Sequence, residues 1–171
     1  MESWSWLERE GLIAPQPANE GWYFITRRGQ KLTEIKDFEA YRKANLLPKQ
    51  ILHPVIAQKV WATFLRGDYD TTIFQAFKEV EVNVRDAGGF IASDLGTALM
   101  RKAFDVNNGP LTDASLVASE KQALSDLFAG AIGSYKNPHS HRNVSLDAEE
   151  TVEMLMLASH LMKIIDSRKR T

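Results

Sequence analysis

The residues best suited to chemistry lie in one short stretch, 136–142, which reads Lys-Asn-Pro-His-Ser-His-Arg. Lys136 and His141 are five positions apart across a proline, so both can reach one phosphate group. An imidazole exchanges protons near neutral pH, with a usual pKa of about 6.5, and an ammonium group stabilises negative charge on phosphoryl oxygens. The stretch is therefore a candidate phosphoryl-transfer site, although the same residues also fit a solvated surface turn.

Pro138 predicts where the preceding helix ends. A proline lacks a backbone N–H and biases the residue before it away from the helical conformation. We therefore expect that helix to end near Lys136, with the cation in its last turn, close to the helix carbonyl groups. His139, His141 and Arg142 are then expected in a short connector at the edge of the core.

A further helix is expected after this connector. Ser145 is a suitable N-cap, and an acidic opening turn follows it. Apolar residues then form two stripes, one made of Val152, Leu155, Ser159 and Met162 and the other of Met154, Leu157, Leu161 and Ile164. This surface is wider than one packing face needs. The last helix is therefore either the centre of a monomeric bundle or a contact between two copies.

Apolar periodicity predicts helices through most of the chain after Leu52. The expected helices span 53–65, 70–86 and 94–103, followed by the helix that ends at the candidate site and the helix after it. The sum is a mainly helical bundle of about five helices with short connections. Glu81 and Arg85 are spaced for an ion pair, which we favour over a catalytic role for Glu81 or Glu79.

The first 32 residues have a different pattern, which predicts a short helix at 4–10, a two-stranded hairpin within 12–25 and a helix from Thr26. The order of these predicted elements resembles that of the recognition helix and wing in winged-helix DNA-binding proteins. The earlier helices of that fold are missing. Arg27, Arg28 and Lys31 are weak candidates for DNA contacts, and a solvated helix face is the favoured alternative. We expect this segment to span 1–32, a helical linker to span 33–51 and the helical bundle to span 52–171. The basic residues of the linker are largely balanced by acidic ones.

Composition restricts the function classes. The chain has 171 residues, 25% of them charged, a net charge of -1 and no cysteine. The absence of cysteine excludes disulfides and thiolate metal sites, and favours the cytoplasm. The near-neutral charge disfavours a strong non-specific nucleic-acid binder. No apolar run approaches the length of a membrane span, and we expect neither a metal nor a cofactor.

The stretch from Tyr135 to Arg142 resembles the signature of the HEPN superfamily, which is an arginine, a polar residue and then a histidine. The wider similarity, over about 52–166, is to its Ymh branch, a group of uncharacterised bacterial proteins whose signature commonly reads Arg-Asn-Pro-x-x-His. Lys136 stands at the position of the family's arginine. Lysine keeps the charge but lacks the flat bidentate fork of arginine, so the replacement is not conservative at a phosphate.

The resemblance implies a metal-independent endoribonuclease that acts in phage defence or as a toxin. In that reading His141 transfers protons, Lys136 binds the scissile phosphate and Asn137 orients the phosphate or the imidazole. Arg142 and His139 are assigned to substrate binding. Because one chain offers one histidine at the motif position, two proton-transfer roles require a homodimer, which HEPN domains form. RNA and an antitoxin or other partner protein are the expected partners.

Two other functions remain open at this point. Lys136 in place of arginine fits a binding module for RNA, nucleotide or protein that has lost catalysis. Alternatively, the chain is a DNA-binding regulator that reads DNA through its first 32 residues and dimerises through its bundle.

Overall fold

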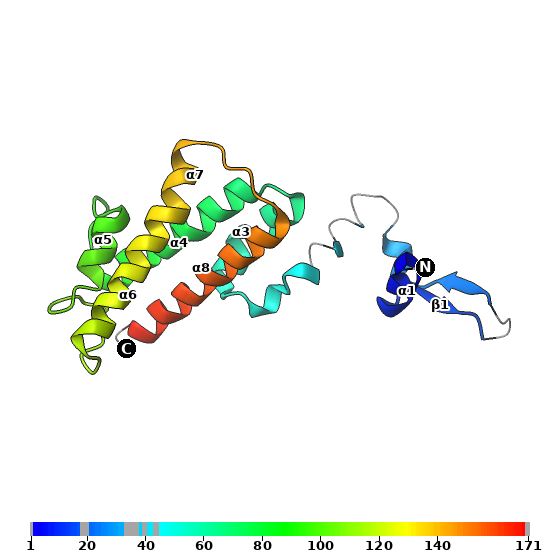
Figure 1. Ribbon diagram of the computed structural model, residues 1–171, viewed down its shortest axis with the longest axis horizontal. Coiled ribbons are helices and arrows are strands. Elements are labelled where there is room, and N and C mark those ends of the chain that lie inside the picture. The colour runs from blue at the N-terminus through cyan, green and yellow to red at the C-terminus, as the bar shows by residue number, and fades with distance from the viewer. Residues whose placement is uncertain (1, 18–20, 33–37, 39–40, 43–44, 170–171) are drawn as a thin grey trace. The chain divides into compact units, whose positions relative to one another are not determined.

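The computed structural model describes residues 2–17, 21–32, 38, 41–42 and 45–169 (Figure 1). The chain divides into two compact units, Met1–Asn45 and Leu46–Thr171. The predicted linker 33–51 spans the junction between them. Five of its seven charged residues, Glu34, Lys36, Asp37, Glu39 and Lys43, lie outside the described residues.

The second unit is a helical bundle, as the periodicity predicted. Its helices are α3 (Pro54–Arg66), α4 (Tyr69–Gly88), α5 (Gly96–Ala103), α6 (Ala118–Ala131), α7 (Asn137–His141) and α8 (Ala148–Arg168). Two short turns complete it, the 3-10 turn η2 (Lys49–Ile51) and the π-helical turn η3 (Ile132–Lys136). The long helix α4 packs against α3, α5 and α8, and also against η3 and α7 (Figure 1). Helix α4 is therefore the element on which the candidate site rests.

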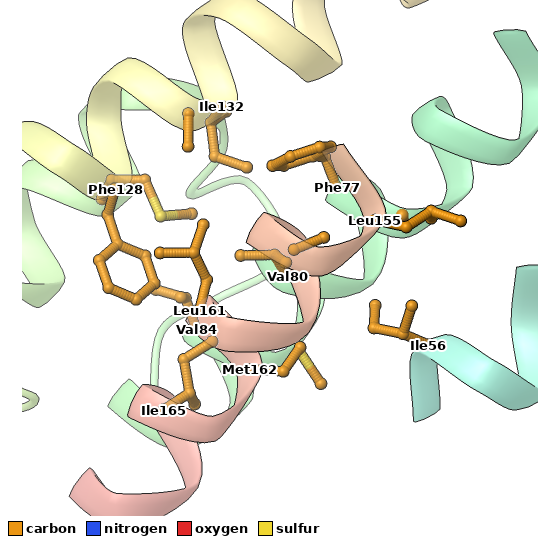
Figure 2. Packing of buried hydrophobic residues seen from close by; sticks show 14 of the residues in the cluster. Ile56, Phe77, Val80, Val84, Phe128, Ile132, Leu155, Leu161, Met162 and Ile165 are labelled. Atoms are coloured by element: carbon orange, nitrogen blue, oxygen red, sulfur yellow. The ribbon is translucent and has the colours of Figure 1, made fainter. Parts of the chain in front are cut away.

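The core of the bundle is formed by α4 and α8 together with residues of α3, α5 and α6, and Figure 2 shows part of it. Phe77 of α4 stacks on Tyr135 with ring centroids 5.2 Å apart, and Phe104 stacks on Phe128 at 4.1 Å. Tyr135 directly precedes Lys136, so its packing fixes the backbone at the candidate site. Other fully buried members include Ile56, Val80, Val84, Ile132, Leu155, Leu161, Met162 and Ile165.

Both apolar stripes of the last helix contribute to this core. Leu155, Ser159 and Met162 of the first stripe are buried. In the second stripe Leu161 is buried, while its other three members are partly buried against the same core. Helix α8 is therefore covered on two sides within one chain, and the width of its apolar surface does not by itself require a second copy.

Long-range hydrogen bonds tie the start of α3 to α8. His53 is the N-cap of α3, where its Nδ1 accepts a hydrogen bond from the N–H of Val55. Its Nε2 lies 2.7 Å from Asp166 Oδ2, and its backbone N–H donates to Ser159 Oγ at 2.6 Å. The predicted helix at 53–65 is thus confirmed, with Pro54 in the first turn, where its missing N–H is not needed.

The C-terminal end of α8 is held to the loop between α5 and α6. Arg168 donates to Asp113, which also accepts from the hydroxyl and backbone N–H of Ser115. These bonds, with the two from Ser115 contributing most, lower the pKa of Asp113 from 3.8 to about 2. The ionised carboxylate is therefore favoured in the folded chain.

The acid sensitivity of the bundle should depend on Asp113. Because its pKa is lower in the folded than in the unfolded chain, its stabilisation is present above pH 3.8 and is lost as the pH falls toward 2. Asp113→Asn should therefore flatten the decline in the free energy of unfolding across this interval, as measured by urea unfolding at several pH values. An unchanged slope between pH 4 and 2 in the variant would contradict this assignment.

The first unit contains the predicted hairpin. Helix α1 (Glu2–Arg9) is followed by strands β1 (Ile13–Pro15) and β2 (Tyr23–Ile25), which pair antiparallel with Ile13 opposite Ile25. The predicted helix from Thr26 is wrong over residues 26–32, where the helical structure is limited to a single 3-10 turn, η1 (Gly29–Lys31). Thr26 Oγ1 donates to the carbonyl of Gly11 and accepts from the N–H of Gly29, so it closes a turn instead of starting a long helix.

Candidate functional site

The candidate site lies on a helix and not in a connector, which corrects the prediction from Pro138. The chain passes from α6 through the π-helical turn η3 into α7, and helical structure ends at His141. His139 and His141 are therefore helical residues, and Arg142 is the C-cap. Lys136 lies at the end of the π-helical turn instead of in a terminal helical turn.

The π-helical turn explains how the helix continues past the proline. In an α-helix the ring of Pro138 would clash with the carbonyl group four residues earlier, and its missing N–H would leave that carbonyl unpaired. In η3 the N–H of Asn137 instead bonds to the carbonyl of Ile132, five residues back, and Pro138 enters at the start of a new short helix. Single π-helical turns of this kind are frequent at functional sites.

The next helix begins later than predicted. Asp147, not Ser145, is the N-cap of α8, and its carboxylate accepts a hydrogen bond from the N–H of Glu150 at 2.8 Å. A carboxylate in this position both satisfies a free N–H group and meets the positive end of the helix dipole. The segment between α7 and α8 is correspondingly longer, and Ser145 is an exposed residue within it.

Three of the candidate residues are open to solvent. Asn137, His141 and Arg142 are all exposed. Asn137 and His141 are four residues apart on α7 and therefore lie on the same side of that helix. The imidazole of His141 makes no hydrogen bond or ion pair with any described residue, so it is available to a ligand.

Lys136 has a long-range partner that its sequence position did not suggest. Its Nζ lies 2.9 Å from Glu81 Oε2, and the two side chains are 17% and 3% exposed. Glu81 Oε2 also accepts from the backbone N–H of Gly96 at 2.8 Å. One buried carboxylate thus joins the π-helical turn to α4 and to the start of α5. An ammonium group has three donors, so Lys136 can still donate to a phosphate while it is paired.

The predicted ion pair between Glu81 and Arg85 is confirmed, with Arg85 Nη2 3.7 Å from Glu81 Oε1. Glu81 therefore faces two cations and sets the local charge of the site. The sequence predicted the pairing of Glu81 with Arg85 but not its contact with Lys136. The available signal was its spacing, four residues after Phe77 and three before Val84, which places it on the inward side of α4.

His139 faces the protein instead of solvent. Its side chain is 3% exposed, and its Nδ1 lies 2.5 Å from Asp70 Oδ1 in the first turn of α4. Asp70 Oδ1 also accepts from the backbone N–H of Val144 at 3.3 Å. These bonds fasten α7 and the segment after it to α4, so His139 holds His141 in place. Substrate binding by His139 stays a prediction.

The basic residues of the first unit are exposed. Arg27, Arg28 and Lys31 all reach solvent, and the guanidinium of Arg28 lies 5.2 Å from the centre of the Tyr41 ring. Their contact with DNA stays a prediction. The same unit contains a cavity of about 570 Å³, whose lining residues are Ser3, Trp6, Leu7, Arg9, Phe38 and Arg42.

Among the described residues, no group of three or more His, Cys, Asp or Glu side chains is placed to hold a metal ion. In the same part of the chain, no helix is both long and apolar enough to cross a bilayer.

Comparisons with known proteins identify the family. No curated protein and no solved structure matches this chain. Residues 50–165, which include α3 through most of α8 and the whole candidate site, match the model of a family described as Hypoth_Ymh, protein of unknown function. The match covers more than half of the chain, so this protein belongs to the Hypoth_Ymh family.

Proposed function

We propose that the helical unit binds RNA and cleaves it without a metal ion, in the manner of HEPN ribonucleases, in phage defence or as a toxin. One observation supports this most directly. The π-helical turn and α7 place an exposed imidazole, His141, one short helix away from a cation, Lys136, whose position is fixed by a buried carboxylate. An imidazole open to solvent and a positioned cation are the groups that phosphodiester transfer without a metal needs.

The reaction follows from the chemistry of RNA. A base removes the proton of a 2'-hydroxyl, and the 2'-oxygen attacks the adjacent phosphorus. The bond from phosphorus to the 5'-oxygen breaks, and that oxygen takes a proton from an acid. The products are a 2',3'-cyclic phosphate and a 5'-hydroxyl end. Lys136 stabilises the phosphoryl oxygens as their negative charge grows, while Asn137 and Arg142 hold the backbone of the RNA.

Two proton-transfer roles require two imidazoles. We therefore propose that two copies of the chain meet with their α7 helices facing one cleft, so that one His141 is the base and the other is the acid. The exposure of α7 and of the segment after it leaves this surface available to a second copy. A solution mass of one chain at all accessible concentrations would contradict this arrangement.

The proposed activity is tested by incubating the protein with total RNA or transfer RNA in the presence of a chelator. We expect fragments that carry 2',3'-cyclic phosphate and 5'-hydroxyl ends, identified by end-specific ligation or mass spectrometry. Fragments with 3'-hydroxyl and 5'-phosphate ends would indicate a different chemistry, and the absence of cleavage would remove the enzymatic proposal.

A second candidate function is supported by the contact between Lys136 and Glu81. Because the Glu81 carboxylate partly neutralises the charge of Lys136, the site fits a module that binds RNA without cleaving it. Lys136→Arg distinguishes the two functions. In an enzyme that lysine impairs, the arginine variant should cleave about tenfold faster, since a guanidinium binds phosphate through two parallel bonds. Retained RNA affinity without cleavage in both proteins would favour the binding module.

A further inference from the structure

We propose that Arg85 is a second phosphate-binding residue of this site and supplies the guanidinium that the motif lacks at position 136. This inference rests on the proposed function and adds a residue that neither the motif nor the family description includes. Three observations support it: Arg85 and Lys136 share one carboxylate, the guanidinium of Arg85 has donors without partners, and the charge around it is net positive. A general property of arginine, its ability to bind phosphate through two parallel bonds, also supports it.

Arg85 and Lys136 meet at the same carboxylate. Arg85 lies in the last turn of α4 and approaches Glu81 Oε1, while Lys136 bonds to Glu81 Oε2 from the π-helical turn. Their side chains are 15% and 17% exposed, so each is mostly enclosed but still reaches solvent. Glu81 thus holds the two cations beside each other, although 51 residues separate them in the chain.

The guanidinium of Arg85 has more donors than its surroundings satisfy. Its closest approach to Glu81 is 3.7 Å, which is too long for a hydrogen bond, and it makes no side-chain hydrogen bond to another described residue. Its Nε is fully buried without a partner in this part of the chain. By contrast, Arg101 on α5 donates to Asp126 at 2.7 Å. Arg168 Nε is also buried without a partner, but another nitrogen of that guanidinium donates to Asp113. A buried donor without a partner is unfavourable, and an unseen water or ion is one explanation for such a group.

The ionised groups around Arg85 have a net positive charge, which favours binding of one further anion. Glu81 carries one negative charge against the two positive charges of Arg85 and Lys136. Asp94 is also near enough for Arg85 to contribute to its lowered pKa, but the larger cause is Lys102, whose Nζ lies 2.5 Å from its carboxylate. Asp94 and Lys102 therefore balance each other. The remaining net positive charge favours a phosphate group next to Arg85 and Lys136.

An arginine side chain supplies the planar guanidinium that is missing at position 136. Lysine presents a compact charge, whereas arginine presents a planar fork that can bind two phosphoryl oxygens in parallel. The family's arginine is replaced by Lys136 in this chain. With Arg85 on the same carboxylate, the site regains a guanidinium from another helix, and Lys136 acts as its partner.

The first experiment titrates inorganic phosphate into the full chain and follows the Nε–Hε signal of Arg85 by NMR, after assignment in the parent protein. We expect this signal to shift with added phosphate, while the Nε–Hε signal of Arg101 stays in place. A shift of both signals alike would indicate non-specific screening and would overturn the inference. An unmoved Arg85 signal would overturn it as well.

The second experiment measures RNA affinity over a range of salt concentrations for the parent and three variants. Arg85→Gln should weaken binding about tenfold and reduce the salt dependence by one phosphate contact. Arg85→Lys should recover part of the affinity, and Arg101→Gln, which removes the same charge from a paired position, should stay within twofold of the parent. Equal effects of Arg85→Gln and Arg101→Gln would overturn the inference.

The two proposals fail in different ways. If His141→Ala loses cleavage but phosphate does not shift the Arg85 signal and Arg85→Gln binds RNA as the parent does, the proposed ribonuclease activity is retained and the role of Arg85 is rejected. A phosphate-dependent shift of Arg85 in a protein that neither binds nor cleaves RNA would retain the anion position and remove the proposed function. Thermal unfolding of each variant shows whether a change in affinity reflects a change in folding.

Discussion

Replacing His141 by alanine should reduce RNA cleavage by about 10²- to 10⁴-fold, which is the usual contribution of a general acid or base. The effect should fall mainly on kcat, because in the proposed reaction the imidazole exchanges protons with the reacting oxygens and is not the main contact with the phosphate. Stability should stay within about 0.5 kcal/mol of the parent, since His141 is an exposed residue near the end of a short helix. Cleavage of a labelled RNA in the presence of a chelator, combined with urea unfolding, measures both quantities.

His160 provides the matched control. It is also an exposed histidine on a helix, but it lies on α8, away from the motif. His160→Ala should cleave RNA at the parental rate. Equal cleavage by the parent and His141→Ala would show that any activity arises outside the motif.

Replacing Glu81 by alanine should lower the free energy of unfolding by about 3 kcal/mol, because removing one member of a buried ion pair leaves the other charge uncompensated. Two cations lose their partner in this variant, and the N–H of Gly96 at the start of α5 loses its acceptor. Arg85 and Lys136 can turn partly toward solvent, which limits the loss. Urea unfolding followed by circular dichroism measures the difference.

A double-mutant cycle tests whether this loss comes from the ion pair. Glu81→Ala combined with Lys136→Met should cost less than the sum of the two single changes, because the charge left unpaired is itself removed. Glu79→Ala is the control, since Glu79 on the same helix is paired with the exposed Lys59 at 3.7 Å and should contribute less than about 1 kcal/mol. Additive losses in the cycle would show that Glu81 and Lys136 act independently.

Local sequence was sufficient for most of the fold. The apolar spacing of Ile73, Phe77, Val80 and Val84 predicted the inward face of α4, and all four side chains are buried. His53 with Pro54 predicted the start of α3, and the hairpin in the first unit was also predicted. These features depend on residues within one or two turns of each other, whose preferences are written directly in the sequence.

The course of the helix at Pro138 could not be predicted in the same way. The local preference of proline favours a helix end, which is the basis of the prediction that the helix stops near Lys136. The structure instead accommodates the ring with a π-helical turn, and burial of Ile132 together with the stacking of Tyr135 on Phe77 holds that turn against α4. Tertiary packing therefore outweighed the local preference and moved both histidines from a connector onto a helix.

The sequence by itself determined that this chain is mainly helical, that its first unit contains a small hairpin, and that a lysine and a histidine lie five positions apart within the region that matches the Hypoth_Ymh family. Only the tertiary structure decided what these motif residues contact. Lys136 meets a carboxylate 55 residues away and His139 meets one 69 residues away, so His139 is enclosed and His141 is left exposed. The physical reason is that charge pairing and burial depend on which helices pack together, and local periodicity does not specify that arrangement.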